Sequence, residues 1–230
     1  MKAMILAAGR GERLRPLTDK TPKPLIPVAG KPLIQYHIEK LAALEVEGLV
    51  INHAWLGEQF EQAFGQGDQF GLPIVYSAEP EGGLETAGGI IHALPLLGKE
   101  AFIVINGDVY TEMDFACLPT KLAPGCLAHL VLVPTPEFKS KGDFGLSQQG
   151  KVESQGDWTF AGISLIHPDL FKNMPAQRQA LAPILREAMQ AGLVTGEVYP
   201  GLWSDVGTLE RLEQIESVIA DREAAKQPAS

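Results

Sequence analysis

The sequence predicts an α/β fold in which a mostly parallel, Rossmann-like sheet is flanked by helices. Short apolar runs of strand length alternate with longer segments in which apolar residues recur at helical spacing. The order strand, helix, strand, helix in the first half is typical of a parallel sheet covered on both faces. Of the 230 residues, 45% are hydrophobic and 20% are charged, which are the proportions of a folded globular chain.

The first half supplies these alternating elements in order. Residues 2–7 form an apolar run that predicts a buried strand, and residues 33–44 repeat apolar residues at helical spacing. Further strands are expected at residues 49–52, 73–76 and 101–106, and further helices at residues 58–64 and 86–97. Parallel sheets bind ligands beyond the carboxyl ends of their strands. Residues 8–18 and 106–108 both follow such ends, so we expect a ligand site there.

The pattern changes in the second half of the chain. Strands are expected at residues 127–133, 144–146, 151–153 and 158–166 and a helix at residues 180–191, and residues 199–203 lead into an Asp-Val-Gly segment at residues 205–207. Thr208 is expected to cap a last helix at residues 209–219, and the polar residues 221–230 are expected to fray. The economical organisation is one domain, residues 1–230, whose halves span about residues 1–110 and about residues 111–220.

Composition and charge exclude several classes of protein. The chain has 28 acidic against 19 basic residues, a net charge of −9, which argues against nucleic-acid binding. No apolar run approaches the roughly 18 residues that cross a membrane. The apolar residues 1–8 are too short for a signal peptide and are followed by Arg10, so we expect a cytoplasmic protein. Cys117 and Cys126 do not make a disulfide framework, and both are expected to be buried, reduced thiols.

The loop after the first strand is the most informative segment. Residues 6–18, here called the signature loop, read Leu-Ala-Ala-Gly-Arg-Gly-Glu-Arg-Leu-Arg-Pro-Leu-Thr. Gly9 and Gly11 let the backbone approach a ligand and direct amide groups at it. The three arginines add positive charge, and Lys23 follows between two prolines that stiffen its approach. Amides, arginines and a positioned lysine are typical of a polyphosphate site.

Two common phosphate loops are excluded. A dinucleotide fingerprint would need a third glycine where Leu14 stands, which counts against a dehydrogenase, and no Gly-Lys-Ser/Thr ending marks a Walker motif. Asp108, at the end of a predicted strand, and Asp205, in a Trp-Ser-Asp-Val-Gly turn, offer hard oxygen ligands for Mg²⁺ beside a triphosphate.

The chain resembles the sugar-1-phosphate nucleotidylyltransferases. Their signature, Leu-Ala-Ala-Gly-x-Gly-x-Arg-Leu-x-Pro-Leu-Thr followed by Pro-Lys-Pro, matches residues 6–18 and 22–24 in spacing and residue type. Further family marks follow in order at residues 84–88, 106–108, 142–145, 160–162 and 203–208, so the resemblance covers nearly the whole chain. It implies a GT-A-like nucleotidyltransferase fold with a nucleotide-binding half followed by a sugar-binding half. It also implies transfer of a nucleotidyl group from a nucleoside triphosphate to a sugar 1-phosphate, with release of pyrophosphate.

The resemblance also implies roles in the nucleotide site. Lys23 would contact the α-phosphate and the transition state, and Asp108 and Asp205 would hold Mg²⁺. Gly11 and Arg13, with neighbouring backbone amides, would contact the leaving β- and γ-phosphates. The implied nucleotide-binding residues are Ala8, Gly9, Gly11, Glu12, Arg13, Lys23, Glu79, Gly88 and Asn106.

The resemblance is less specific about the base and the sugar. Glu79 or Glu85 could accept from the N3–H of a pyrimidine, and a plain helix cap by Thr86 remains the alternative. Many relatives have glycine where Glu85 stands. On the sugar side, Asp143 could bond hydroxyl groups, and Glu153 is a candidate because the Glu-Lys-Pro turn of many relatives is missing here. This departure suggests a sugar other than ordinary glucose or mannose.

Residues 50–57, 85–90 and 203–211 resemble the N-acetylmuramate α-1-phosphate uridylyltransferases of cell-wall recycling. This implies UTP and N-acetylmuramate α-1-phosphate as substrates. His53 and Trp55 mark the subgroup, although a packing role for Trp55 remains open. The alternatives with the same chemistry are a mannose-1-phosphate guanylyltransferase and a glucose-1-phosphate thymidylyltransferase. An alternative of another class is a non-catalytic nucleotide-sugar sensor, against which the presence of Lys23, Asp108 and Asp205 counts. Nothing in the sequence indicates an oligomeric state.

Overall fold

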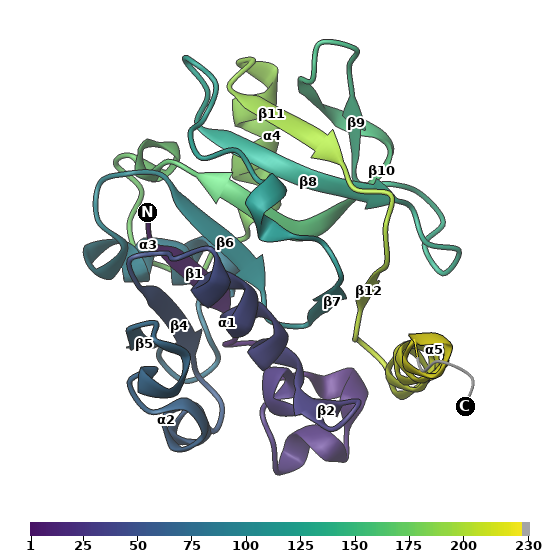
Figure 1. Ribbon diagram of the computed structural model, residues 1–230. Helices are drawn as coiled ribbons and strands as arrows, with labels where there is room; N and C mark the ends of the chain where they lie inside the picture. The colour runs from purple at the N-terminus through teal and green to yellow at the C-terminus, as the bar shows by residue number, and fades with distance from the viewer. Residues whose placement is uncertain (227–230) are drawn as a thin grey trace.

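The computed structural model describes residues 1–226. Its centre is one mixed sheet in the order β11-β8-β10-β6-β1-β4-β5, with β9 paired to β10 (Figure 1). Strands β1, β4, β5 and β6 pair in parallel. They span Ala3–Leu6, Leu49–His53, Ile74–Ala78 and Phe102–Asn106 in that order. The four strands predicted for the first half are therefore confirmed.

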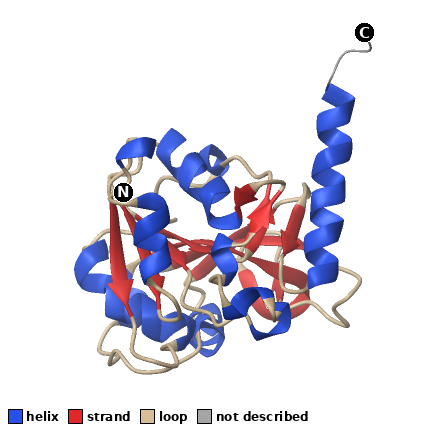
Figure 2. Ribbon diagram, turned by 90° about the horizontal axis from the view of Figure 1, so that it is seen from below, coloured by secondary structure: helices blue, strands red, loops and turns tan. Residues whose placement is uncertain are grey.

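Helices cover both faces of this sheet (Figure 2). Ile5 of β1 lies in a hydrophobic core shared with α1 and α2, whereas Met4 beside it lies in a second core shared with α3 and α4. The four helices span Leu33–Ala43, Glu58–Phe64, Glu85–Leu97 and Leu181–Gln190. Because successive strand side chains point to opposite faces, a continuous apolar run such as β1 fills both cores.

The second half of the chain completes the sheet with mixed pairing. β10 (Val152–Ile166) is antiparallel to β6, to β8 (Ala128–Pro134) and to β9 (Phe144–Leu146), and β11 (Val194–Val198) is parallel to β8. The prediction of separate strands at residues 151–153 and 158–166 was wrong. They form one long strand whose register shifts twice. The polar residues in its middle interrupt the apolar sequence pattern, but the strand continues through them. β11 was not predicted.

Smaller elements complete the fold. β7 (Val109–Thr111) pairs antiparallel with β12 (Trp203–Asp205), and β2 (Pro27–Val28) pairs with β3 (Lys31–Pro32). Single 3₁₀ turns lie at Glu12–Leu14, Leu17–Asp19, Lys23–Leu25, Asp68–Phe70, Phe115–Cys117 and Pro168–Phe171.

The last helix, α5 (Leu209–Lys226), is longer than predicted. The Thr208 hydroxyl accepts from the backbone N–H of Arg211 at 3.3 Å, which confirms the predicted cap. Ile215 packs in a third core beside Val28. Residues 221–226 are helical rather than frayed, and residues 227–230 of the predicted tail lie outside the described residues.

Two expectations about composition can be compared with the described residues. Both cysteines are free, but Cys117 is exposed and only Cys126 is buried, so the expectation of two buried thiols was half wrong. None of the helices described has both the length and the apolar character needed to span a membrane.

Candidate functional site

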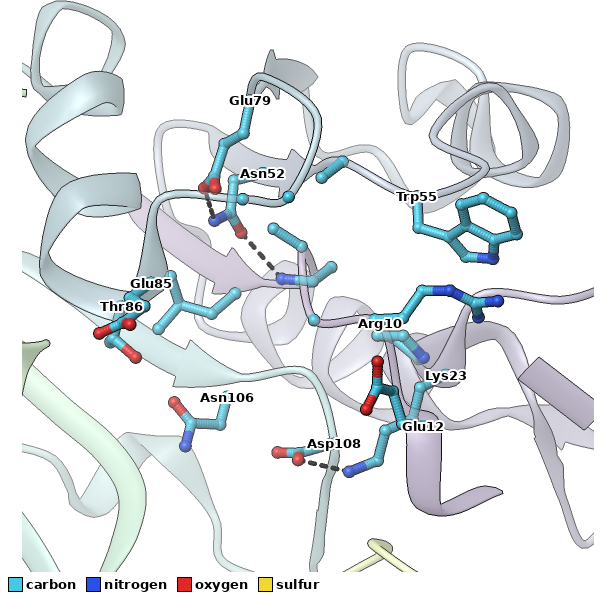
Figure 3. Close-up of a pocket in the computed structure, with 18 of the residues that line it drawn as sticks. Arg10, Glu12, Lys23, Asn52, Trp55, Glu79, Glu85, Thr86, Asn106 and Asp108 are labelled. Carbon is cyan, nitrogen blue, oxygen red and sulfur yellow. Dashed lines mark hydrogen bonds and ion pairs between the residues drawn. The ribbon is translucent and has the colours of Figure 1, made fainter. Parts of the chain in front are cut away.

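A cavity of about 1030 Å³ opens at the carboxyl ends of the four parallel strands. This is where open α/β sheets bind ligands, and the cavity falls within the upper range of small-molecule sites. Its lining comes from the signature loop, from the segments that follow β4, β5 and β6, and from the start of α3 (Figure 3). The lining residues are Leu6, Ala7, Ala8, Gly9, Arg10, Glu12, Lys23, Pro24, Asn52, Ala54, Trp55, Glu79, Glu81, Gly82, Gly83, Glu85, Thr86, Asn106, Asp108 and Arg178.

The signature loop is fixed by a tight contact between Gly11, Thr18 and Lys23. Gly11 has φ +68°, and a Cβ there would lie 2.9 Å from Cγ2 of Thr18 and 3.0 Å from Cβ of Lys23. The buried Thr18 hydroxyl donates to the carbonyl oxygen of Gly11 at 2.9 Å. Glycine is required here by both its backbone conformation and its lack of a side chain. Gly11 itself does not line the cavity, and its contact with a nucleotide stays a prediction.

Lys23 reaches the cavity from a 3₁₀ turn and meets Asp108 there. Its side chain is only 10% exposed, and its Nζ donates to Oδ2 of Asp108 at 2.6 Å (Figure 3). The two residues are far apart in the sequence, and the fold brings them together: Asp108 closely follows β6, and Lys23 begins the 3₁₀ turn Lys23–Leu25 after the signature loop. A lysine and a carboxylate predicted on separate grounds thus share one wall of the cavity.

Asp205 lies on the strand beside Asp108. β12 and β7 pair with Asp205 opposite Val109, and the backbone N–H of Val206 donates to the carbonyl oxygen of Asp108 at 2.8 Å. Burial raises the pKa of Asp205, the Arg211 guanidinium opposes that rise, and the Asp108 carboxylate adds to it. Arg211, itself 9% exposed, forms an ion pair with Asp205. The two aspartates predicted to act as a pair are therefore close enough for the Asp108 carboxylate to raise the pKa of Asp205.

This pair fits a hard divalent cation. Carboxylate oxygens suit Mg²⁺, which takes one or two of them and completes its shell with substrate phosphates and water. Among the described residues no group of three or more His, Cys, Asp or Glu side chains is placed to hold a metal ion. Asp108 lines the main cavity with Lys23, whereas Asp205 lines a second cavity, and a cation held by this pair stays a prediction.

The opposite wall of the cavity carries acidic residues that are already engaged. Glu79 is 9% exposed, and its carboxylate accepts from Asn52 Nδ2 at 2.5 Å and from the backbone N–H of Leu84 at 2.7 Å. Asn52 Oδ1 in turn accepts from the backbone N–H of Ala7 at 2.8 Å. Asn52 was not predicted as a site residue. The available signal was a polar residue at the end of an otherwise apolar strand.

Glu85 and Thr86 lie at the start of α3 and face the cavity. Glu85 has φ +59° and pairs with Arg178 at 3.1 Å. A carboxylate in an ion pair and a backbone in the left-handed region make this turn an unusual helix start. No side-chain cap bond is formed at the start of α3, so the capping alternative for Thr86 is not realised there.

Several predicted site residues lie away from this cavity. Arg13 lines a second cavity, of about 420 Å³, together with Asp205 and Arg211. Gly88 packs inside α3, where a Cβ would lie 2.2 Å from the carbonyl oxygen of Gln177. Of the predicted nucleotide-binding residues, Ala8, Gly9, Glu12, Lys23, Glu79 and Asn106 line the main cavity.

The two predicted sugar-binding residues line neither cavity. Asp143 accepts from Lys139 Nζ at 2.8 and 2.9 Å and from the backbone N–H of Phe160 at 3.0 Å. Glu153 lies exposed on β10 beside Gly145. In this structure Asp143 therefore joins its loop to β10, and its contact with a sugar stays a prediction.

Comparison with known proteins agrees with this geometry. A family model described as nucleotidyl transferase matches residues 2–155. An N-acetylmuramate alpha-1-phosphate uridylyltransferase from Neisseria meningitidis is 50% identical over 95% of this chain and 98% of its own, and one from Caulobacter vibrioides is 34% identical over 89% and 91%. A Bacillus anthracis protein described as a glucose-1-phosphate thymidylyltransferase, solved with sucrose, superposes with a TM-score of 0.83 over 96% of both chains. Its sequence identity is 22%, so that likeness concerns the fold.

Proposed function

The chain belongs to the nucleotidyl transferase family, and from that premise we propose that it transfers a uridylyl group from UTP to a sugar 1-phosphate. The sugar we propose is N-acetylmuramate α-1-phosphate, which the name of the Neisseria relative gives. The products are the UDP-sugar and pyrophosphate. The observation that carries the proposal is the cavity wall on which Lys23 meets Asp108, with Asp205 on the neighbouring strand.

The reaction needs positioning and charge neutralisation rather than a base. An anionic oxygen of the sugar 1-phosphate attacks the α-phosphorus of UTP, a new P–O bond forms, and the bond to the β-phosphate oxygen breaks. Pyrophosphate leaves with the electron pair. Because the nucleophile is already deprotonated, no residue has to remove a proton, and the barrier lies in bringing two polyanions together.

The residues of the cavity can meet that demand. We propose that Lys23 binds the α-phosphate and the charge that develops there, since its ammonium group is largely shielded from water and is held at the wall. Ala8 and Gly9 of the signature loop line the same space, and we propose that their backbone amides bind phosphate oxygens. Asn106, at the end of β6, would contact the sugar phosphate side or the ribose.

The family generally uses a divalent metal ion, and we propose Mg²⁺ held by Asp108 and Asp205. The ion supplies charge neutralisation for the phosphates when bound. Binding of this ion would require Asp108 to exchange its contact with Lys23, which would be free to move to the incoming phosphate. The substrates are small phosphorylated molecules, which the basic residues Arg10 and Lys23 of the cavity can bind despite the net negative charge of the protein. A location in the cytoplasm stays a prediction from the sequence.

The test is a substrate panel. The protein is incubated with Mg²⁺, each of the four common nucleoside triphosphates and dTTP, and the 1-phosphates of N-acetylmuramate, N-acetylglucosamine, glucose and mannose, and pyrophosphate release is measured. We expect release with UTP and N-acetylmuramate 1-phosphate. Release with GTP and mannose 1-phosphate, or with dTTP and glucose 1-phosphate, would replace the proposed substrates. Nucleotide binding without any release would support a sensor instead.

A further inference from the structure

Arg10 and Trp55 form a stacked pair on the wall of the main cavity. The guanidinium carbon of Arg10 lies 3.9 Å from the centre of the Trp55 ring, within the range of a cation–π contact. Arg10 belongs to the signature loop, whereas Trp55 follows β4, and both line the cavity. Trp55 is 39% exposed, so its indole is a surface of the site rather than part of the core (Figure 3).

The pair is anchored on one buried residue of the loop. Arg10 Nη1 donates to the carbonyl oxygen of Thr18 at 2.6 Å, and Trp55 Nε1 donates to the same oxygen at 3.1 Å. Arg10 Nη2 donates to Oδ1 of Asp19 at 3.1 Å. An arginine has five N–H groups in a rigid plane, so these two bonds fix the guanidinium and leave three N–H groups for a ligand.

The charged residues of the cavity lie on two sides, and Arg10 belongs to the basic side. Glu79, Glu81 and Glu85 line the side near α3, whereas Arg10 and Lys23 line the side near the signature loop. The other arginine of the cavity, Arg178, is paired with Glu85. Glu12 is the acid of the signature loop on the Lys23 side, and its side chain is exposed, where water and salt screen its charge.

A triphosphate whose α-phosphate lies at Lys23 would extend along this basic side. The resemblance assigns its terminal phosphates to Arg13, but Arg13 lines the second cavity. We propose that Arg10 binds the terminal phosphates of the bound triphosphate and that Trp55 is a positioning residue, which holds the guanidinium in place by stacking and through Thr18. The inference rests on the proposed function, because it takes a nucleoside triphosphate as the ligand.

The test compares ligands with and without terminal phosphates. Binding of UMP and of a non-hydrolysable UTP analogue, both with Mg²⁺, is measured by titration calorimetry for the wild-type protein, Arg10→Gln, Trp55→Leu and Trp55→Phe. We expect Arg10→Gln to weaken binding of the analogue about ten- to hundredfold, the usual effect of losing a charged hydrogen bond, and to change UMP binding less than about twofold. Trp55→Leu should act in the same direction, and Trp55→Phe should recover part of the loss because a ring remains under the guanidinium.

Arg15→Gln is the matched control. Arg15 Nε donates to the same Oδ1 of Asp19 at 3.2 Å, yet Arg15 does not line the cavity, so its loss should leave both affinities unchanged. Equal weakening of UMP and the analogue by Arg10→Gln would make Arg10 a support of the loop and overturn the inference, as would an unchanged affinity. A wild-type protein that binds no triphosphate would instead refute the proposed function itself.

Discussion

In the proposed function Lys23 binds phosphate and Asp108 binds the metal ion, so the ion pair between them competes with both ligands. Lys23 and Asp108 neutralise each other across 2.6 Å, and Asp205 forms an ion pair with Arg211. A metal ion that binds without nucleotide must therefore displace the ammonium group of Lys23 from Asp108. A nucleotide instead offers Lys23 another anion and so releases Asp108 for the metal ion. This arrangement favours joint binding of metal and nucleotide.

We expect Lys23→Met to bind Mn²⁺ several-fold more tightly than the wild-type protein when no nucleotide is present. The reason is the loss of a positive charge beside a metal-binding carboxylate. Turnover should fall about 10²- to 10³-fold, as when one donor to a developing charge is removed. Electron paramagnetic resonance of free Mn²⁺ measures the first effect independently of activity.

Lys20→Met is the control for this prediction, because Lys20 is an exposed lysine three positions away. It should change neither metal affinity nor turnover. A Mn²⁺ affinity that stays the same in Lys23→Met would mean that the ion pair does not restrict the metal site.

At the scale of single residues, the sequence predicts the chemistry of the site better than the direction of its side chains. Asp108 could be predicted because it follows a strand of a parallel sheet and such ends bind ligands, and Lys23 because it stands between two prolines after the signature loop. Arg13 and Gly88 stand at matching positions of the motif but line no part of the main cavity. Spacing along the chain does not determine whether a long side chain turns into a cavity or along its rim.

At the scale of elements, α1 is joined to β7 by a buried histidine. His37 is fully buried, its Nε2 lies 2.7 Å from the carbonyl oxygen of Val109, and its ring stacks on Phe115. Burial lowers the pKa of His37 from 6.5 to about 4, and the bond to Val109 opposes this only in part. The folded protein thus keeps this imidazole neutral at a pH where an unfolded chain would protonate it.

The free energy of unfolding should therefore fall as the pH drops from about 6.5 towards 4. In this window the unfolded state binds the proton and the folded state does not, so acid favours unfolding. The contribution of His37 is present above the unfolded pKa and amounts to at most about 3 kcal/mol. Urea denaturation at pH 7 and pH 5 measures it. His37→Gln should flatten the dependence on pH, and His92→Gln, at an exposed position of α3, should not. Equal slopes in the wild type and His37→Gln would contradict this account.

Elements with a strong local pattern could be predicted, and those set by tertiary pairing could not. α2 spans the predicted residues 58–64, because a clear apolar spacing is followed by Gly65. β10 was divided in two because its middle is polar and contains Gly156, although pairing with β8 and β9 carries the strand through. Four of the five residues of β11 are only partly buried. The strand depends on its parallel pairing with β8, which the local sequence does not indicate.

At the scale of the whole molecule, the two halves are joined by one sheet. β6 of the first half pairs with β10 of the second, and Ile5 and Ile163 lie in the same hydrophobic core. The sequence predicted a mostly parallel sheet and a mixed second half, because the alternation of strands and helices ends near the middle of the chain. The two halves could form one continuous sheet or two separate sheets, depending on which strand pairs with β6. The sequence of β6 does not specify that partner, because its residues are apolar on both faces.

A shared sheet and core predict a single cooperative unfolding transition, in which a ligand bound at the strand ends of the first half stabilises the second half equally. UTP with Mg²⁺ at one hundred times its dissociation constant adds about 2.7 kcal/mol to the free energy of unfolding. For a chain of this size, that raises the melting temperature by roughly 5–10 °C.

Melting followed by tryptophan fluorescence and by circular dichroism should give coincident curves, because Trp55 reports the first half and Trp158 and Trp203 the second. UTP without a divalent cation should produce a smaller shift, since the carboxylates of Asp108 and Asp205 then repel the triphosphate. Two transitions, of which the ligand moves only one, would mean that the halves fold as separate units and that the pairing of β6 with β10 does not couple them.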